Sequence, residues 1–406
     1  MHTLIGAPNR ENSEVAHITP KSTPLSILLL FFVEIITFLF VEMNRYYHHQ
    51  FLDNFDDGPS PQREVTEAEL FAFLALTLQM GHKVQDRLEQ YWTKLEQPCT
   101  PFYGKTMARA RYCHILRFLH FTDNKRNGVD RTDDRLWKMR DLFEIIRTNF
   151  SKFYNPSKHL AVDEVIVKFK GRVLFKKYIP KKCKCFSIKM FKLCDSYDMN
   201  VYLGKDRQRV AQHLTATHTT VTNLTSGVVG FGHKLYRDNF FSSSDLFDDM
   251  ALKKVSCCRI VRLHRKRMPN DLKSKTRILK RGDNRVRTRS DLIAVVWRDK
   301  RGVCLLTNIH DPPTDGNYHD EHGNAIKPAI VADYNRHMGH VDNADRMANS
   351  YTASHRTWKW TKKLFFHLLD LAIVNSYILL SSCGGKKISH RFLTHPYQRN
   401  AGMGWA

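Results

Sequence analysis

The sequence predicts an α/β protein with a helical N-terminal region and a basic subdomain inserted into its mixed core. Up to about residue 155 the apolar residues recur with helical spacing, whereas β-branched and aromatic residues dominate 159–170 and 185–194. Helix-like and strand-like segments then alternate to residue 380, interrupted at 258–289 by an intensely basic stretch. We therefore expect helices first, a sheet in the middle and helices again at the end.

The composition points to a folded protein that binds a polyanion. The chain has 406 residues, and 64 Lys and Arg against 40 Asp and Glu give a formal net charge of +24. Hydrophobic residues make up 42% of the chain, which is enough for packed cores and excludes a disordered basic tail. Clustered positive charge favours phosphate binding, so we expect nucleic acid as the partner, with acidic membranes and acidic proteins as alternatives. The nine scattered cysteines contain no C-x-x-C repeat, which argues against a zinc site or a disulfide framework.

Two apolar segments need a choice between membrane and core. Residues 25–41 are nearly continuous in apolar side chains, but a bilayer asks for about 20 residues. Glu34 near the middle would cost about 2.5–3.5 kcal/mol on insertion scales. We therefore expect a buried helix here, with a membrane anchor as the alternative. Residues 364–380, interrupted by His367 and Asp370, are also expected to form a core helix.

Local signals place the remaining N-terminal elements. Thr66 and Glu69 form a capping-box pattern before a helix expected over 70–80, with Gly81 as its terminator. Further helices are expected over 107–121 and 133–153, with loops at 53–61 and 124–129.

The second half of the chain alternates between strands and helices. The strands at 159–170 and 185–194 are expected to be joined by a turn at Gly171 and Arg172. The other expected elements are strands at 231–238, 292–297 and 303–309, helices at 214–224 and 242–254, a loop at 311–324, and helices from 335 to 380.

Four aspartates in three segments carry the candidate chemistry. Asp163 lies in the first strand, Asp238 ends a later one, and Asp342 and Asp345 open a helix one turn apart. Their oxygens are ligands that Mg²⁺ prefers, and Mn²⁺ is the alternative cation. Two cations about 3.5–4 Å apart could activate a nucleophile and stabilise the leaving oxygen of a phosphodiester. The pattern predicts metal-dependent phosphoryl transfer on nucleic acid.

Each acid also has a structural explanation. Asp163 and Glu164 occupy opposite pleat rows of their strand, and periodicity alone does not choose between them. Asp238 could cap a turn, while Asp342 and Asp345 are common residue types in the first turn of a helix. The combination, rather than any single residue, favours a metal site.

Two basic runs flank these acids and favour phosphate contacts over a solvated face. The run 168–192 interleaves Lys and Arg with aromatic residues, and the run 259–289 is dominated by arginine. Either run could include a nuclear import signal. The candidate DNA-binding residues are Lys170, Arg172, Lys181, Lys182, Arg262, Arg265, Lys266, Arg267 and Arg356.

Several of these segments resemble the piggyBac transposase family. The most specific are AVDEVIVKFKGR at 161–172, YRDNFFSS at 236–243 and YNRHMGHVD at 334–342. The likeness continues in consistent order from about residue 25 to 380, and it is greatest to the transposable element-derived members of animal genomes.

The resemblance implies an RNase H-like catalytic core formed by 156–254 and 331–382, with an insertion domain over 255–330. It also implies a helical region over 24–155 for dimerisation and DNA binding, after a short tail over 1–23. A homodimer in the nucleus would then perform cut-and-paste transposition at TTAA sites through hairpin intermediates, and no membrane is involved. Asp163, Asp238 and Asp342 fall on the catalytic positions, with Asp345 on an additional acidic position. This favours Asp163 over Glu164 and leaves Asp195 as structural.

Two features depart from the family pattern. The tail over 383–406 lacks the cysteine- and histidine-rich zinc module with which the family usually ends. The segment 196–204 is shorter than the corresponding segment of the family, so a truncated core strand is expected. The alternative function is therefore a domesticated, catalytically silent protein that binds specific DNA sequences.

Overall fold

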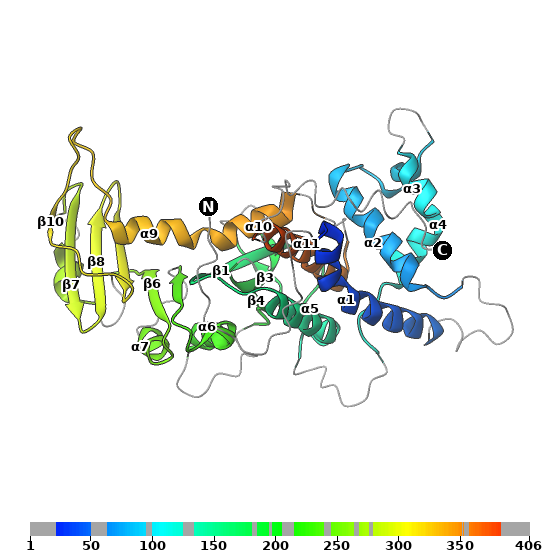
Figure 1. Ribbon diagram of the computed structural model, residues 1–406, viewed down its shortest axis with the longest axis horizontal. Helices are drawn as coiled ribbons and strands as arrows, with labels where there is room; N and C mark the ends of the chain where they lie inside the picture. Colours follow the sequence, from blue (N-terminus) through cyan, green and yellow to red (C-terminus); the bar gives the residue numbers. More distant parts are fainter. Residues whose placement is uncertain are drawn as a thin grey trace.

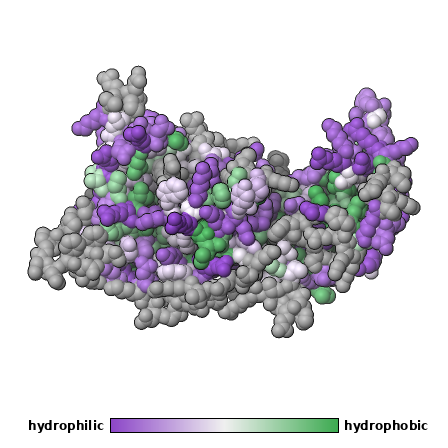
Figure 2. Space-filling model, turned by 180° about the vertical axis from the view of Figure 1, so that it is seen from behind, coloured by the Kyte–Doolittle hydropathy of each residue, from purple (hydrophilic) through white to green (hydrophobic). Residues whose placement is uncertain are grey.

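The computed structural model is an elongated molecule with helices at one end and antiparallel strands at the other, joined by a central sheet (Figure 1). Hydrophilic side chains predominate at both ends, and the surface is hollowed between them (Figure 2). The structure describes residues 22–49, 63–94, 100–124, 134–180, 185–194, 197–204, 215–238, 245–263, 268–275, 279–350, 352 and 357–382. The expected loop at 53–61, residues 125–129 of the second loop, and Asp195 lie outside these ranges.

The N-terminal region is helical, as predicted. The capping box is confirmed, because Thr66 Oγ1 accepts from the Glu69 amide at 3.2 Å and the Glu69 carboxylate accepts from the Thr66 amide at 3.0 Å. Gly81 is not the terminator, since the helix continues to His82. The elements are α1 (Pro24–Tyr47), α2 (Glu67–His82), the 3₁₀ turn η2 (Leu88–Trp92), α3 (Pro101–Thr106), α4 (Arg109–Phe118) and α5 (Arg140–Phe153).

Helix α5 begins later than predicted. Asp134 belongs to a preceding turn, where its carboxylate accepts from the Leu136 amide at 2.9 Å and from the Arg140 guanidinium at 2.8 Å. The acidic residue therefore fixes the turn that leads into the helix. The expected helix over 107–121 is likewise shorter, because the chain leaves helical geometry at Leu119.

The two apolar helices α1 and α11 (Trp360–Ser382) are long and apolar enough to cross a membrane, yet they pack against each other. In the most apolar window of α11, 78% is buried, against 39% for α1. Phe31 and Ile35 of α1 are buried in the N-terminal core, whereas Glu34 lies on its exposed side. The prediction of core helices is confirmed for the packed faces of both.

The central sheet combines antiparallel and parallel strands. β1 (His159–Lys168) pairs antiparallel with β3 (Phe186–Leu193), which pairs antiparallel with β4 (Asp198–Val201). On its other side β1 pairs parallel with β5 (Lys234–Arg237), and β5 pairs parallel with β6 (Ser256–Ile260). The sequence predicted β1, β3 and β5; the four-residue β4 lies in the segment where a truncated strand was expected.

The turn after β1 requires glycine at Gly171. A Cβ atom built there would lie 2.7 Å from the carbonyl oxygen of Trp358, which is closer than real Cβ contacts. The chain then forms the short strand β2 (Lys177–Tyr178), which pairs with β3.

The basic stretch contributes strands to the same sheet. β6 pairs antiparallel with β9 (Gly302–Thr307), and β8 (Leu292–Arg298) lies between β9 and β7 (Asp283–Arg289). The β8–β9 pair was predicted, whereas β6 and β7 were hidden in the basic run. The described strands make one ten-stranded sheet, completed by β10 (Gly316–Asn317), and α8 (Asn270–Lys275) precedes β7.

Helices cover both faces of the central sheet. α6 (Ala216–Thr225) and α7 (Asp245–Leu252) pack on one face with Leu160 and Val162 of β1. α10 (His340–Ser350) and α11 pack on the other face with Ala161 and Val165. α9 (Ala329–Met338) runs from the outer strands toward α10 (Figure 1). The C-terminal helices, which were expected from residue 335, therefore begin earlier, at Ala329.

Candidate active site

The parallel pairing of β1 with β5 makes two of the predicted aspartates neighbours in the central sheet. In this register Val162 pairs with Arg237, so Asp163 and Asp238 are the next residues on adjacent strands. Asp238 follows the last residue of β5 and is exposed, whereas Asp163 is partly buried. The backbone alone therefore places both carboxylates side by side.

Helix α10 supplies the third segment. Val341 and Ala344 are buried in the same cluster as Val165 of β1, which holds the first turn of α10 against the sheet. Asp342 is exposed in that turn, where the helix dipole favours a carboxylate. Asp345 follows one turn later, and its buried Oδ1 has no hydrogen-bond partner among the described residues.

The pleat of β1 distinguishes Asp163 from Glu164. Asp163 shares a row with Ala161 and Val165, which lie on the face covered by α10. Glu164 belongs to the opposite row and forms an ion pair with Lys189 of β3. Of these two acids, Asp163 thus lies on the sheet face that is covered by α10, the helix of Asp342.

The pKa of Asp163 reflects both its burial and the charges of two other candidate aspartates. Burial raises the pKa of Asp163 to about 7, although the Glu164 amide donates to its Oδ1 at 2.7 Å and opposes this shift. The negative charges of Asp342 and Asp238 raise the pKa further. A carboxyl group whose pKa is raised by burial and by neighbouring acids is typical of a site that binds a cation.

The donor set fits a hard divalent cation. All candidate ligands are carboxylate oxygens, and no described residue donates a hydrogen bond to the buried Oδ1 of Asp345. Nevertheless, in the part of the chain that the structure describes, no three carboxylate, imidazole or thiol groups already enclose an ion position. Cation binding would therefore require side-chain rotation, which the exposed Asp238 and Asp342 permit.

The predicted DNA-binding residues fall into two sets. Lys170 and Arg172 follow β1, Arg262 follows β6, and all three are exposed. The others lie outside the described residues: Lys181, Lys182, Arg265, Lys266, Arg267 and Arg356.

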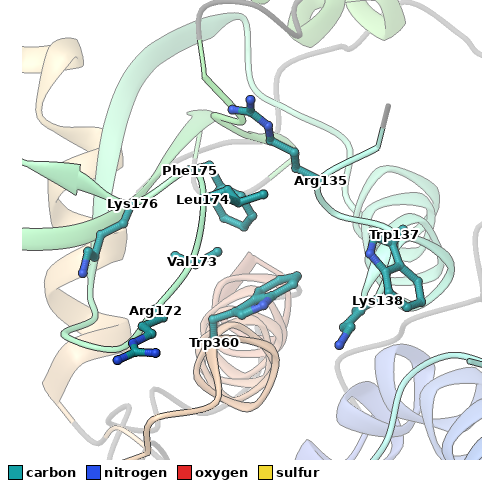
Figure 3. Close-up of a pocket in the computed structure, with 9 residues that line it drawn as sticks. All are labelled: Arg135, Trp137, Lys138, Arg172, Val173, Leu174, Phe175, Lys176 and Trp360. Atoms are coloured by element: carbon teal, nitrogen blue, oxygen red, sulfur yellow. The ribbon is translucent and has the colours of Figure 1, made fainter. Parts of the chain in front are cut away.

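Arg172 also lines a pocket of about 510 Å³ that the sequence did not reveal. Figure 3 shows aromatic rings and basic side chains around it, and none of the described residues that line it is acidic. The mixed aromatic and basic sequence of 135–138 was the available signal. The lining residues are Arg135, Trp137, Lys138, Arg172, Val173, Leu174, Phe175, Lys176 and Trp360.

Part of the second basic run is engaged inside the protein. Arg259 is buried with its guanidinium carbon 4.7 Å from the centre of the Phe247 ring, and the buried Arg237 lies 5.2 Å from the same ring. Arg287 forms an ion pair with Asp271 at 2.6 Å. Arg237 and Arg259 thus contribute to packing and Arg287 to a partly exposed ion pair, so positive charge in the sequence does not by itself identify a phosphate contact.

Comparison with known proteins is consistent across the chain. The family model described as Transposase IS4 matches residues 23–377. Human piggyBac transposable element-derived protein 3 is 24% identical over 378 residues, covering 89% of this chain but only 62% of that protein. Human piggyBac transposable element-derived protein 5 is 21% identical over 398 residues, covering 92% and 72% respectively.

A solved structure shares the fold. The cryo-EM structure of a piggyBac transposase synaptic complex with hairpin DNA superposes with a TM-score of 0.82 at 24% identity. The match covers 93% of this chain and 80% of that chain. The mixed α/β architecture described above is therefore one that a transposase adopts.

Proposed function

Because the chain belongs to the piggyBac transposase family, we propose that it forms a metal-dependent site for DNA strand cleavage and transfer. Asp163, Asp238 and Asp342 are its catalytic residues, and Asp345 is an additional metal ligand. The observation that carries the proposal is the register of β1 with β5, which makes Asp163 and Asp238 neighbours, together with the packing of α10 on the face of β1 that carries Asp163; the raised pKa of Asp163 agrees with it. This arrangement involves all three chain segments that carry the aspartates.

The sheet order supports an RNase H-like core. Three antiparallel strands in the order β4–β3–β1 are followed by the parallel strands β5 and β6. In this arrangement the middle of β1 and the end of β5 present acids toward a helix from the far end of the chain. We assign residues 156–254 and 331–382 to this core and 255–330 to the inserted domain, whose first strand, β6, extends the core sheet.

The four carboxylates would hold Mg²⁺ or Mn²⁺. Bound in pairs, such ions supply an activated nucleophile and stabilise the leaving oxygen of a phosphodiester. The chain's own part is to hold the oxygens in place: the Glu164 amide orients Asp163, and packing of Val341 fixes the turn that carries Asp342. Asp163 is shielded from water on one side, which strengthens its attraction for a cation.

The basic residues would hold the DNA. Exposed Lys170, Arg172 and Arg262 suit phosphate contacts, and we include Lys181, Lys182, Arg265, Lys266, Arg267 and Arg356 in the same role. The pocket beside Arg172 combines cationic and aromatic side chains, which suits a distorted or single-stranded segment. The relative named above was solved with hairpin DNA, and we propose transposon ends and a TTAA target as the substrates here.

Assembly and location complete the proposal. The helical region 24–155 would mediate a homodimer, since paired DNA ends are best held by a symmetric assembly. We place the chain in the nucleus, where chromosomal DNA would be its substrate. Light scattering of the purified chain with and without DNA tests the dimer, and microscopy of a tagged chain tests the location.

A cleavage assay tests the central proposal. The purified chain is incubated with Mn²⁺ or Mg²⁺ and an end-labelled duplex that contains a TTAA-flanked end, while a gel-shift assay follows binding. We expect metal-dependent strand cleavage that Asp238→Asn abolishes without loss of binding. Metal-independent binding with no cleavage under any condition would instead favour the domesticated, catalytically silent DNA-binding protein.

A further inference from the structure

A second aspartate-centred cluster lies outside the proposed catalytic site. Asp333 of α9 accepts from the hydroxyl of Tyr236 on β5 at 2.6 Å. The same carboxylate oxygen lies 2.9 Å from Nε2 of His310, which follows β9, and its other oxygen lies 3.2 Å from Nδ1 of His337. One carboxylate thus connects a core strand, the outer strands and its own helix.

The proton positions in this cluster follow from its geometry. The Ile309 amide donates to Thr307 Oγ1 at 3.1 Å, so the threonine hydroxyl can donate to Nδ1 of His310 at 2.9 Å. The Nε2–H of His310 then points at Asp333. Burial disfavours the ionised form of Asp333, but the bonds from Tyr236 and His310 outweigh it and lower the pKa of Asp333.

Stacked rings stabilise the other side of the cluster. The ring of His337 lies 4.0 Å from that of His159 and 4.8 Å from that of Tyr236, close to parallel with both. Nδ1 of His159 is 3.1 Å from the Tyr236 hydroxyl, whose proton goes to Asp333, so His159 donates. Burial lowers the pKa of His159 to about 4, which keeps it neutral at physiological pH.

The cluster is connected to the proposed metal site through the backbone. Tyr236 precedes Asp238 by two residues, and the hydroxyl of Tyr334 donates to the carbonyl oxygen of Arg237 at 3.2 Å. α9 ends at Met338 and α10 begins at His340, so one residue separates the helix that carries Asp333 from the helix that carries Asp342. The position of α9 on β5 therefore sets the distance between Asp342 and Asp238.

We propose that Asp333 is a positioning residue that assembles the acidic site by holding α9 against β5. His310 extends the same contact to the outer strands, so displacement of those strands would be transmitted to α10. This inference rests on the proposed function, because it concerns the same four aspartates. A contact that only stabilised the fold would leave cation affinity unchanged in the folded protein.

Binding of Mn²⁺ by the purified full chain, followed by electron paramagnetic resonance of the free ion, tests the proposal without requiring cleavage. The variants are Asp333→Asn and Tyr236→Phe; the second keeps the stacked ring and removes only the hydroxyl. Asp320→Asn is the matched control, because its carboxylate also accepts hydrogen bonds but lies in an exposed turn. We expect both test variants to bind Mn²⁺ on the order of tenfold more weakly, as after loss of a supporting hydrogen bond at a metal site. The control and the affinity for duplex DNA should not change.

The possible results separate the inference from the proposed function. Wild-type Mn²⁺ binding that Asp163→Asn removes, together with unchanged affinity in Asp333→Asn and Tyr236→Phe, overturns the positioning role alone. Parallel loss of DNA binding in these two variants also overturns it, because the defect would then be general. Absence of Asp163-dependent Mn²⁺ binding in the wild type overturns the proposed metal site and this inference with it.

Discussion

Two aspartate-centred clusters on the same sheet differ in how their charge is compensated. Around Asp163, burial and two neighbouring acids raise the pKa to about 7. Around Asp333, a tyrosine and a histidine donate hydrogen bonds to the carboxylate, and its pKa is lowered despite burial. At neutral pH the first arrangement destabilises the folded state, whereas the second stabilises it. This difference is the one we expect if the first cluster belongs to the proposed metal site and the second to the scaffold.

The largest expected effect is on catalysis, when a negative charge is removed from the proposed metal site. Changing Asp163, Asp238 or Asp342 to Asn removes a negative ligand and nearly preserves its shape. We expect cleavage to fall by about 10²–10³-fold or more, because charge stabilisation in the transition state is lost. Asp345→Asn should be less damaging, since its neighbour Asp342 remains. The measurement is single-turnover cleavage, with DNA affinity as the control; full activity in Asp238→Asn would contradict the proposed site.

The next effect concerns stability without metal. The folded-state pKa of Asp163 lies above its unfolded value of 3.8, so its stabilising contribution is complete below pH 3.8 and is lost as pH rises through about 7. Asp163→Asn should therefore raise the free energy of unfolding at pH 8, by on the order of 2 kcal/mol.

The gain in Asp163→Asn should shrink as the pH is lowered toward 4, and urea unfolding at pH 8 and pH 5 measures it. Mn²⁺ should stabilise the wild type more than the variant, because a cation that binds only the folded state shifts the equilibrium. A variant that is less stable than the wild type at pH 8 would show that the acidic site is not strained.

The opposite sign is expected at the scaffold cluster. Asp333→Asn replaces a charged acceptor of hydrogen bonds from Tyr236 and His310 with a neutral amide. We expect a loss of about 1–3 kcal/mol in the free energy of unfolding at pH 7. The same urea experiment measures it beside Asp320→Asn, and equal stability of the two variants would remove the contrast between the clusters.

The sequence predicted those parts of the fold that local pattern determines. The alternation in 159–170 and 185–194 predicted β1 and β3, and the capping box at Thr66 predicted the start of α2. The candidate aspartates came from residue type and from family resemblance. What brings three of them together is the parallel pairing of β1 with β5 and the packing of Val341, which are long-range contacts with no local signal.

Other features were missed for the same physical reason. β6 reads as part of a basic run because Arg259 is in it, yet this side chain is buried over Phe247. Asp333 and His310 belong to segments 23 residues apart and meet only when α9 returns to the sheet. Gly81 has the residue type of a terminator, but tertiary packing carried α2 past it.

The last and smallest prediction applies the contrast to positive charge. Arg262 is exposed beyond β6, whereas Arg287 is held by Asp271 and Asp315. If exposed arginines bind phosphate, Arg262→Gln should weaken duplex binding a few-fold and reduce the slope of log affinity against log salt by about 0.9. Arg287→Gln changes the net charge equally but should leave the slope unchanged, because its guanidinium is already occupied by carboxylates. Fluorescence anisotropy over a series of salt concentrations measures both variants. Equal slopes would mean that general charge, rather than the position of Arg262, attracts the DNA.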